Sequence, residues 1–559
     1  MFTPTATVSG HDFAARFLLR WAGAVWPCDI KKECIVTRAS IYGRSELRPV
    51  LRLFALVGLV LLFALIPLWS PSAQAQAPLP GSFAPAPCPF GPLEGLTIDC
   101  GYLTVIESRR NPTERTIQLA VAILRSPNPN KDPNPALFLS GGPGQPALPL
   151  ISFVAVAYTP ILLQRDIVLI DQRGTGYSQP ALNCPSANAF DARFPLGAQP
   201  QDRPELVQFQ ADLLIACGRE YQAAGVDLEA YNSVENAADL EDLRVALGVS
   251  QWNLLGASYG TRLALTAMRY RPETIRSAVL DSAYPLDANF HVNVFESYDR
   301  ALGRLFAACA ATPECNTAYP NLAAQFEELI PRLNAEPIVV PLVNPQTGEV
   351  LDYLPVTGVD VSTIVFQLFY STLDIPALPL IIGDLARGDT ELFSLILSIL
   401  LLQNMPGAVP PVSQLMQTAT QCNEDVTFAA PSDFVAARDA HRRASALAFV
   451  VTFNEAILEV CAALGLGPGS GAEDEPVFSD VPTLIISGEF DPITPPSYAY
   501  RAGETLSESE VIVYPHGGHT PSTVSPCLVQ AMTDFYANPQ GPINTACIAN
   551  EAPIPFFVR

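Results

Sequence analysis

The chain has 559 residues, with 55 acidic against 32 basic side chains and a formal net charge of -23 at pH 7. This length is enough for a large core and more than one domain. So acidic a chain argues against nucleic acid as a partner and against charge-driven binding to an anionic membrane, but it is compatible with a cationic ligand, such as the amino terminus of a peptide, and with a plain solvated acidic surface.

The first 77 residues carry a targeting pattern. An apolar run at residues 53–68 follows three arginines and precedes small residues of the A-x-A type. This pattern predicts a secretory signal peptide cleaved near Ala75; an uncleaved membrane anchor is the alternative. Residues 1–77 are assigned to this extension. The expected location is secreted or extracytoplasmic, with membrane contact only through this segment if it is not cleaved.

Ten of the twelve cysteines follow this segment, and Cys28 and Cys34 precede it. An even number of cysteines in an exported protein predicts disulfides. We expect each cysteine to pair with its neighbour in the sequence. No C-x-x-C ladder is present, so no metal site is predicted. The expected pairs are Cys88–Cys100, Cys184–Cys217, Cys309–Cys315, Cys422–Cys461 and Cys527–Cys547.

Short apolar runs and amphipathic helices alternate after a Pro- and Ala-rich linker at 77–89. This alternation predicts a mostly parallel sheet with helices on both faces, whose chemistry lies at the carboxyl ends of the strands. The predicted strands are 96–106, 116–124, 135–139, 166–170, 252–255, 277–280, 481–487 and 511–514, and the predicted helices near the site are 236–247 and 259–271.

From about residue 289 to 474 helical patterns dominate, with few strand signals. The apolar run 392–402 is too short to span a membrane, so it is either a buried helix or the underside of a lid. We therefore predict one sheet domain split by an inserted helical cap. The predicted segments are 78–288 and 476–559 for the sheet domain and 289–475 for the cap.

The pentapeptide Gly256-Ala-Ser258-Tyr-Gly260 lies between a predicted strand and a predicted helix. Strand, tight turn and helix are the context of a nucleophile elbow, in which Ser258 sits on a strained turn at the end of a sheet. The first amides of the following helix then point at the reacting centre.

A serine nucleophile needs a basic histidine and an acid that orients it, in the order serine, acid, histidine along this type of chain. His519 follows the last predicted strand and is the expected base, with His516 as the alternative. Asp491 follows the preceding strand and is the expected acid, with Glu489 as the alternative.

The oxyanion needs two preorganised backbone donors. One is expected from the amide of Tyr259, directly after the nucleophile. The other is expected from the glycine-rich loop after strand 135–139, with Gly142 favoured over Gly141. Asp171 and Arg173, which follow strand 166–170, are expected to hold their loop in place beside the site.

Five motifs in order, SGGPG, DQRGTGYS, GASYG, GEFDPITPP and GGHT, resemble the tripeptidyl aminopeptidase-like branch of the α/β-hydrolases, relatives of the prolyl aminopeptidases. The resemblance runs from about Cys88 to Cys547. It implies an α/β-hydrolase fold and an exopeptidase that releases short peptides from a free amino terminus by acyl transfer, without cofactor or metal. Ser140 departs from the histidine usual before the glycines of prolyl aminopeptidases, which weakens any expectation of strict proline specificity.

Such an enzyme must bind a positive amino terminus. Glu424 or Asp425, beside Cys422 in the insert, is the predicted anchor through charge-assisted hydrogen bonds. A solvated helix start, with the two acids near its first turn, is the alternative interpretation. Two other functions stay open: an esterase or lipase with an apolar pocket under the lid, and a binding protein without catalysis, against which the intact serine, acid and histidine argue.

Overall fold

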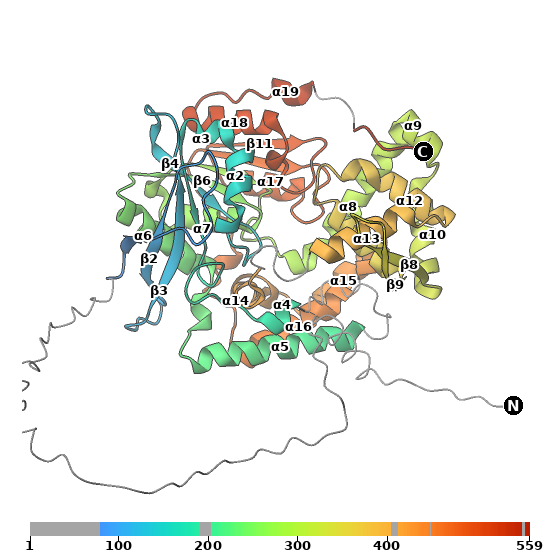
Figure 1. Ribbon diagram of the computed structural model, residues 1–559, viewed down its shortest axis with the longest axis horizontal. Coiled ribbons are helices and arrows are strands. Elements are labelled where there is room, and N and C mark those ends of the chain that lie inside the picture. The colour runs from blue at the N-terminus through green and yellow to red at the C-terminus, as the bar shows by residue number, and fades with distance from the viewer. Residues whose placement is uncertain (1–78, 190–202, 404–411, 448, 551–553) are drawn as a thin grey trace, which may run out of the picture. The chain divides into compact units, whose positions relative to one another are not determined.

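The computed structural model describes residues 79–189, 203–403, 412–447, 449–550 and 554–559 (Figure 1). The chain divides into two units, Met1–Gln76 and Ala77–Arg559, and all described residues belong to the second. The predicted signal or anchor segment, with Cys28 and Cys34, lies outside the described residues. Within the described ranges, no helix has the length and apolar character needed to cross a membrane.

A nine-stranded sheet forms the centre of the described unit. Its order is β1-β2-β3-β5-β4-β6-β7-β10-β11. The neighbours from β5 to β11 run parallel, and the pairs β1–β2, β2–β3 and β3–β5 are antiparallel. All eight predicted strands are present, so the prediction of a mostly parallel sheet is confirmed. The strands are β1 (Ser82–Pro85), β2 (Ile98–Ile106), β3 (Thr116–Leu124), β4 (Asp132–Leu139), β5 (Arg165–Ile170), β6 (Trp252–Ala257), β7 (Ile275–Asp281), β10 (Thr483–Gly488) and β11 (Ser509–Tyr514).

Helices cover both faces of this sheet (Figure 1). Strands β5, β6 and β10 are buried at every residue, as expected for strands between two layers of helices. Leu254 and Leu255, adjacent on β6, belong to cores on opposite faces. The first core includes side chains of α6 (Ser233–Leu247), α7 (Tyr259–Tyr270) and α17 (Pro496–Gly503), and the second those of α2 (Ile151–Ala157), α3 (Thr159–Leu162) and α18 (Pro526–Ala537).

Most of the residues between β7 and β10, here called the insert, are helical. The insert contains α8 (Phe290–Ala311), α9 (Pro313–Ala318), α10 (Leu322–Ala335), α11 (Gly358–Leu368), α12 (Leu378–Arg387), α13 (Glu391–Gln403), α14 (Gln414–Glu424), α15 (Pro431–Ala440) and α16 (Phe449–Leu464). Outside it lie α4 (Pro185–Ala189), α5 (Arg203–Ala223) and α19 (Ala546–Ala549). The exact boundaries of a cap domain stay a prediction.

Two strand features differ from the sequence prediction. The expected linker at 77–89 contains β1, an edge strand that pairs with β2 and tolerates Pro85 at its end. The insert contains an antiparallel pair, β8 (Ile338–Val343) and β9 (Val350–Val356). Their β-branched residues flank a turn in which Gly348 has φ +73°, a hairpin signal that the surrounding helical patterns obscured.

The apolar run 392–402 forms most of α13, whose Phe393 and Leu397 are buried. The helix packs on β8, where the Ser398 hydroxyl accepts a hydrogen bond of 2.8 Å from the amide of Val343. Among the described residues, none of α13 lines the cavity described below. The structure therefore favours the buried helix over the underside of a lid.

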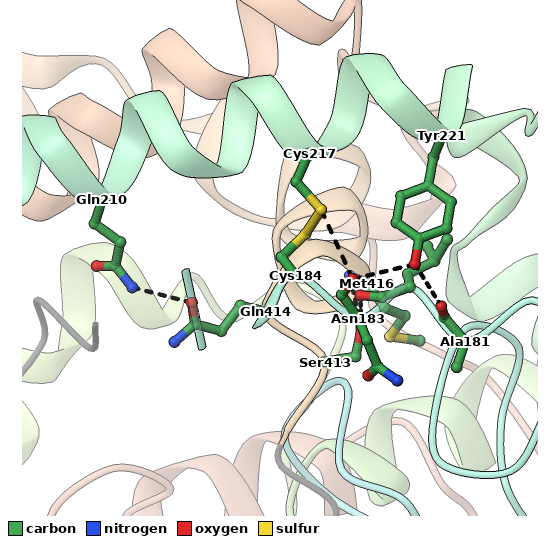
Figure 2. Close-up of a disulfide and its surroundings, with 10 residues drawn as sticks. Ala181, Asn183, Cys184, Gln210, Cys217, Tyr221, Ser413, Gln414 and Met416 are labelled. Atoms are coloured by element: carbon green, nitrogen blue, oxygen red, sulfur yellow. Dashed lines mark hydrogen bonds between the residues drawn. A yellow bond between two sulfur atoms is a disulfide. The ribbon is translucent and has the colours of Figure 1, made fainter. Parts of the chain in front are cut away.

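All five expected disulfides are present in the described residues, with the predicted neighbour pairing. Figure 2 shows the one between Cys184 and Cys217, which fastens the segment before α4 to α5. Next to it the Tyr221 hydroxyl donates to the carbonyls of Ala181, at 2.7 Å, and Asn183, at 3.1 Å. Helix α5 is thereby held to the chain that leaves the loop after β5.

Candidate active site

Ser258 lies between β6 and α7, at the carboxyl edge of the sheet. Its backbone has φ +56° and ψ -125°, a strained conformation for a residue with a β-carbon. Its amide donates to the carbonyl of Asp281 on β7, at 3.0 Å. A β-carbon at Gly260 would lie 2.0 Å from the carbonyl oxygen of Leu139, so only glycine lets α7 start this close to β4. These features are those of the predicted elbow.

His519 and Asp491 form a hydrogen-bonded pair. The Nδ1 atom of His519 lies 2.8 Å from Oδ2 of Asp491, and the carboxylate is fully buried. The backbone amide of His519 donates to the carbonyl of Tyr370, at 3.0 Å, and the two rings meet edge to face. The insert therefore helps to fix the imidazole.

The environment of Asp491 keeps it ionised. Its Oδ1 accepts from the amides of Ile493 and Thr494, both at 2.9 Å, and its Oδ2 accepts from the hydroxyls of Ser282, at 2.9 Å, and Thr494, at 2.7 Å. Burial raises the pKa of Asp491, but the charge of His519 and these hydrogen bonds outweigh burial, so the pKa is lowered. The sequence analysis did not predict the hydrogen bonds of Ser282 and Thr494 to this acid. Thr494 could have been found, because it lies three residues after Asp491 in the motif GEFDPITPP.

Glu489 and His516, the alternatives for the acid and the base, make contacts elsewhere. Oε1 of Glu489 lies 2.6 Å from the Arg304 guanidinium, and its ion pairs turn it away from the imidazole. The ring of His516 packs against Tyr514 and is absent from the lining of the cavity, within the described residues. The structure thus brings together His519 and Asp491 rather than their competitors.

The glycine-rich loop after β4 lies directly over the elbow. A β-carbon at Gly141 would meet Cβ of Ser258 at 3.0 Å, and Gly142 has φ +107°. The loop is closed by the Ser140 hydroxyl, which donates to the carbonyl of Gln145 at 2.6 Å. Tyr259 opens α7, so its amide has no acceptor within the helix. The predicted donors, Gly142 and Tyr259, and the alternative Gly141 all line one cavity with Ser258.

The insert also holds this loop from outside. The amide of Ser413, the residue that caps α14, donates to the carbonyl of Gly144 at 2.9 Å. Gly144 has φ +91°, and a β-carbon there would lie 2.6 Å from the carbonyl oxygen of Ser413. The loop and α14 are therefore in direct backbone contact.

Asp171 and Arg173 make the contacts expected of structural residues. The Asp171 carboxylate accepts from the amides of Ala147, Leu148 and Tyr177 at 2.7–2.8 Å, and burial raises its pKa to about 6. Arg173 is fully buried and donates twice to Asp239 of α6. Both side chains fix the loop after β5.

The cavity that contains these groups has a volume of about 780 Å³. It lies between the carboxyl edge of the sheet and the insert, and both contribute to its walls. Ser258, His519, Glu424 and Asp425 all line it. Its apolar lining includes Phe138, Phe153, Phe290, Phe366, Phe453 and Ile493.

The two predicted anchoring acids differ in their surroundings. Glu424 pairs with the Arg262 guanidinium, at 3.3 Å, and accepts from the amide and the hydroxyl of Ser233. Its charge is compensated within the protein. Asp425 accepts from the Tyr284 hydroxyl at Oδ2, but its Oδ1 is buried with no hydrogen-bond partner among the described residues. Of the two, Asp425 has the free capacity to accept a donor.

A further buried acid lies behind the elbow. Asp281 accepts at Oδ2 from the hydroxyl of Ser522, at 2.5 Å, and from its amide, at 3.3 Å. Burial raises its pKa to about 7, although the hydrogen bonds of Ser522 and the charge of His519 act in the opposite direction. Asp281 therefore stays protonated in the folded protein over a pH range in which an unfolded aspartate is ionised.

This shift predicts how stability depends on pH. Between pH 4 and 7 the folded state binds one more proton at Asp281 than the unfolded state, so its contribution to the free energy of unfolding is lost as pH rises, by up to about 4 kcal/mol. Asp281→Asn should make denaturant-derived unfolding free energies less dependent on pH in this window. Asp99→Asn, at an exposed carboxylate, should keep the original slope.

No cluster of three or more His, Cys, Asp or Glu side chains suited to a metal ion occurs in the described part of the chain. Sequence comparison matches residues 134–340 to the alpha/beta hydrolase fold and residues 448–547 to the TAP-like protein family.

Three curated relatives are similar over parts of their length. The chain is 28% identical over 253 residues to the hydrolase-named YuaR of Escherichia coli K12, covering 43% of this chain and 48% of that protein. It is 28% identical over 192 residues to the tripeptidyl aminopeptidase of Streptomyces coelicolor, covering 33% and 35%. It is 27% identical over 226 residues to the serine protease Hip1 of Mycobacterium tuberculosis, covering 39% and 42%. The chain thus spans less than half of the length of these relatives. Together with the sheet order, these findings show that the chain has the α/β-hydrolase fold and that residues 448–547 match the TAP-like protein family.

Proposed function

We propose that this protein is a serine exopeptidase that hydrolyses peptides from a free amino terminus, with tripeptidyl or prolyl aminopeptidase-like specificity, and that it acts outside the cytoplasm. The observation that carries the proposal is one cavity with two features. Ser258 and the Asp491-paired His519 line it, and so does Asp425, which has an unpartnered buried oxygen. The five disulfides support an extracytoplasmic location.

In the proposed reaction the Ser258 hydroxyl attacks the scissile carbonyl carbon while His519 takes its proton. The oxyanion accepts hydrogen bonds from the amides of Tyr259 and Gly142. His519 then gives the proton to the leaving amine as the C–N bond breaks, which leaves an acyl-enzyme. Water then loses a proton to His519 and attacks the ester carbon, and His519 returns this proton to Ser258 Oγ as the ester C–O bond breaks and the acid product departs. Asp491 stabilises the imidazolium in both steps.

The substrate's amino terminus is proposed to bind Asp425. A protonated amine supplies the hydrogen-bond donor that Oδ1 lacks. The amine also brings a positive charge, and no arginine or lysine forms an ion pair with this carboxylate among the described residues. Glu424 is proposed to support the same end of the cavity through Arg262 and Ser233, as a positioning residue.

A panel of peptides with free and acetylated amino termini, read by mass spectrometry, tests this proposal. Free peptides should be cleaved with kcat/KM roughly 10- to 100-fold above their acetylated forms, since hydrogen bonds to a charged group contribute about 1.5–3 kcal/mol. Asp425→Asn should remove most of this preference, and Asp439→Asn, at an exposed acid of α15, should not. Equal cleavage of free and acetylated peptides would contradict the proposal.

The second candidate is an esterase, which the apolar lining of the cavity favours. An acyl ester without any amino group would then be the better substrate. Activity on nitrophenyl esters alone does not separate the two candidates, because an activated ester can acylate Ser258 in either enzyme. The comparison must therefore use unactivated esters against free peptides of similar size.

A further inference from the structure

Residues with a strained backbone gather around the proposed triad. Among the described residues, four that are not glycine have a positive φ: Ser258, Ser282, Thr520 and Asn321. Asn321 caps α10, and asparagine tolerates this conformation. The other three are the nucleophile, a residue bonded to the acid, and the residue after the base. Strain of this kind persists only where surrounding contacts hold it, and the proposed reaction does not explain it at Ser282 or Thr520.

The end of β7 lies between the strand of the nucleophile and the strand of the acid, because the sheet order there is β6-β7-β10. The carbonyl of Asp281 accepts from the amide of Ser258, at 3.0 Å. The amide of the next residue, Ser282, donates to the carbonyl of Ile486 on β10, at 2.8 Å. Asp281 and Ser282 therefore connect the elbow to the strand of the acid through backbone hydrogen bonds.

The side chain of Ser282, which is fully buried, adds the loop of the base to this connection. Its Oγ donates to Oδ2 of Asp491, at 2.9 Å, and accepts from the amide of Thr520, at 2.7 Å. A hydroxyl can donate one hydrogen bond and accept others, so the two contacts are compatible. Oδ2 is also the oxygen that lies 2.8 Å from Nδ1 of His519. One hydroxyl thus joins the acid to the residue that follows the base.

Two neighbouring contacts are similar but connect other segments. The Thr494 hydroxyl donates to Oδ2 of Asp491, at 2.7 Å, and lies 3.1 Å from Nδ1 of His519, but Thr494 belongs to the loop of the acid itself. Ser522 fastens the loop of the base to β7, but it bonds Asp281 and not the acid. The Ser522 contact should keep this loop in place when the Ser282 hydroxyl is removed, so we expect variants at Ser282 to fold.

We infer that Ser282 is a positioning residue of the proposed triad: its hydroxyl holds Oδ2 of Asp491 in place relative to His519, and its strained backbone sets that hydroxyl between the two loops. The inference rests on the part of the proposed function in which Ser258, Asp491 and His519 act together. It does not depend on the preference for a free amino terminus.

Ser282→Gly and Ser282→Ala separate the effect of the hydroxyl from that of the backbone. Both variants lack the hydroxyl, but glycine adopts a φ of +63° without strain and alanine does not. If Ser282 only stabilised the fold, glycine would be tolerated better than alanine and would keep the activity. A positioning role instead predicts that kcat falls by about 10- to 100-fold in both variants, with KM within about twofold, because each loses a hydrogen bond to a charged group.

The measurement is steady-state kinetics with a free tripeptide p-nitroanilide and with p-nitrophenyl acetate, which needs the triad but no amine subsite. Ser277→Ala is the matched control. It removes another fully buried hydroxyl of β7, which donates to Asn253 at 2.7 Å, and Ser277 is absent from the cavity lining within the described residues. We expect Ser277→Ala to keep kcat on both substrates, even where it lowers the midpoint of thermal unfolding.

Proton NMR gives a readout that does not depend on turnover. The ionised Asp491 can only accept, so Nδ1 of His519 carries the shared proton, whose low-field signal reports the geometry of this hydrogen bond. Ser282→Gly should shift or broaden the signal, and Ser277→Ala should preserve it. An unchanged kcat or an unchanged signal in Ser282→Gly overturns the inference. If the unsubstituted protein cleaves neither substrate, the proposed function is wrong, and the NMR comparison still decides whether Ser282 holds the pair.

Discussion

Ser258→Ala is expected to lower kcat/KM by at least about 10⁴-fold on every substrate, since the acyl-enzyme can no longer form and only binding and the oxyanion donors remain. Labelling by a fluorophosphonate should disappear with it. The measurement is initial-rate kinetics alongside gel-based labelling. The midpoint of thermal unfolding should stay close to that of the unsubstituted protein, because alanine keeps the backbone and removes one half-buried oxygen.

Ser507→Ala provides the matched control. Ser507 is exposed, remote from the cavity lining, and its loss should change neither rate nor labelling. If Ser258→Ala kept substantial activity, or if the label moved to another serine, the assignment of the nucleophile would be wrong. Such a result would favour the interpretation as a binding protein without catalysis.

The second large effect is expected from Asp491→Asn, which should lower kcat by about 10⁴-fold with little change in KM. The amide keeps the size of the side chain, but it neither stabilises the imidazolium nor holds His519 Nδ1 as the proton donor. Steady-state kinetics from pH 6 to 10 measures the loss. Activity that partly returns at high pH would agree with a base that has lost its orienting charge.

Glu489→Gln is the paired control, because it neutralises the acid two residues earlier that the sequence left as an alternative. Its carboxylate faces Arg300 and Arg304, so we expect activity within a few-fold of the unsubstituted enzyme. A larger loss in Glu489→Gln than in Asp491→Asn would reverse the two assignments.

The features of the site that depend on residues close together in the sequence could be predicted from the sequence. A glycine on each side of Ser258 indicated a turn that only small residues allow, and the chain order of acid and histidine indicated which side chains meet. The strands of the sheet were equally readable, because parallel strands buried on both faces are short continuous apolar runs. The predicted pairing of each cysteine with its neighbour in the sequence was also confirmed.

The remaining features depend on contacts between distant segments. Nothing near Glu424 in the sequence indicates that Arg262, 162 residues earlier, takes up its charge, whereas Asp425 retains an unpartnered oxygen. The sequence predicts His291 as a core or surface histidine, and the contact that its Nδ1 makes with Oδ1 of Asn454 on α16, at 2.7 Å, could not be read from the sequence around it. The hairpin of β8 and β9 was missed because helical patterns surround it in the sequence, and because β9 is largely exposed and interrupted by Asp352.

The backbone contact between Gly144 and Ser413 joins access and chemistry. A displacement of α14 would also displace the loop that carries Gly142, because the Ser413 amide donates a hydrogen bond to the Gly144 carbonyl. The position of the predicted oxyanion donor is therefore coupled mechanically to the wall that the insert contributes to the cavity.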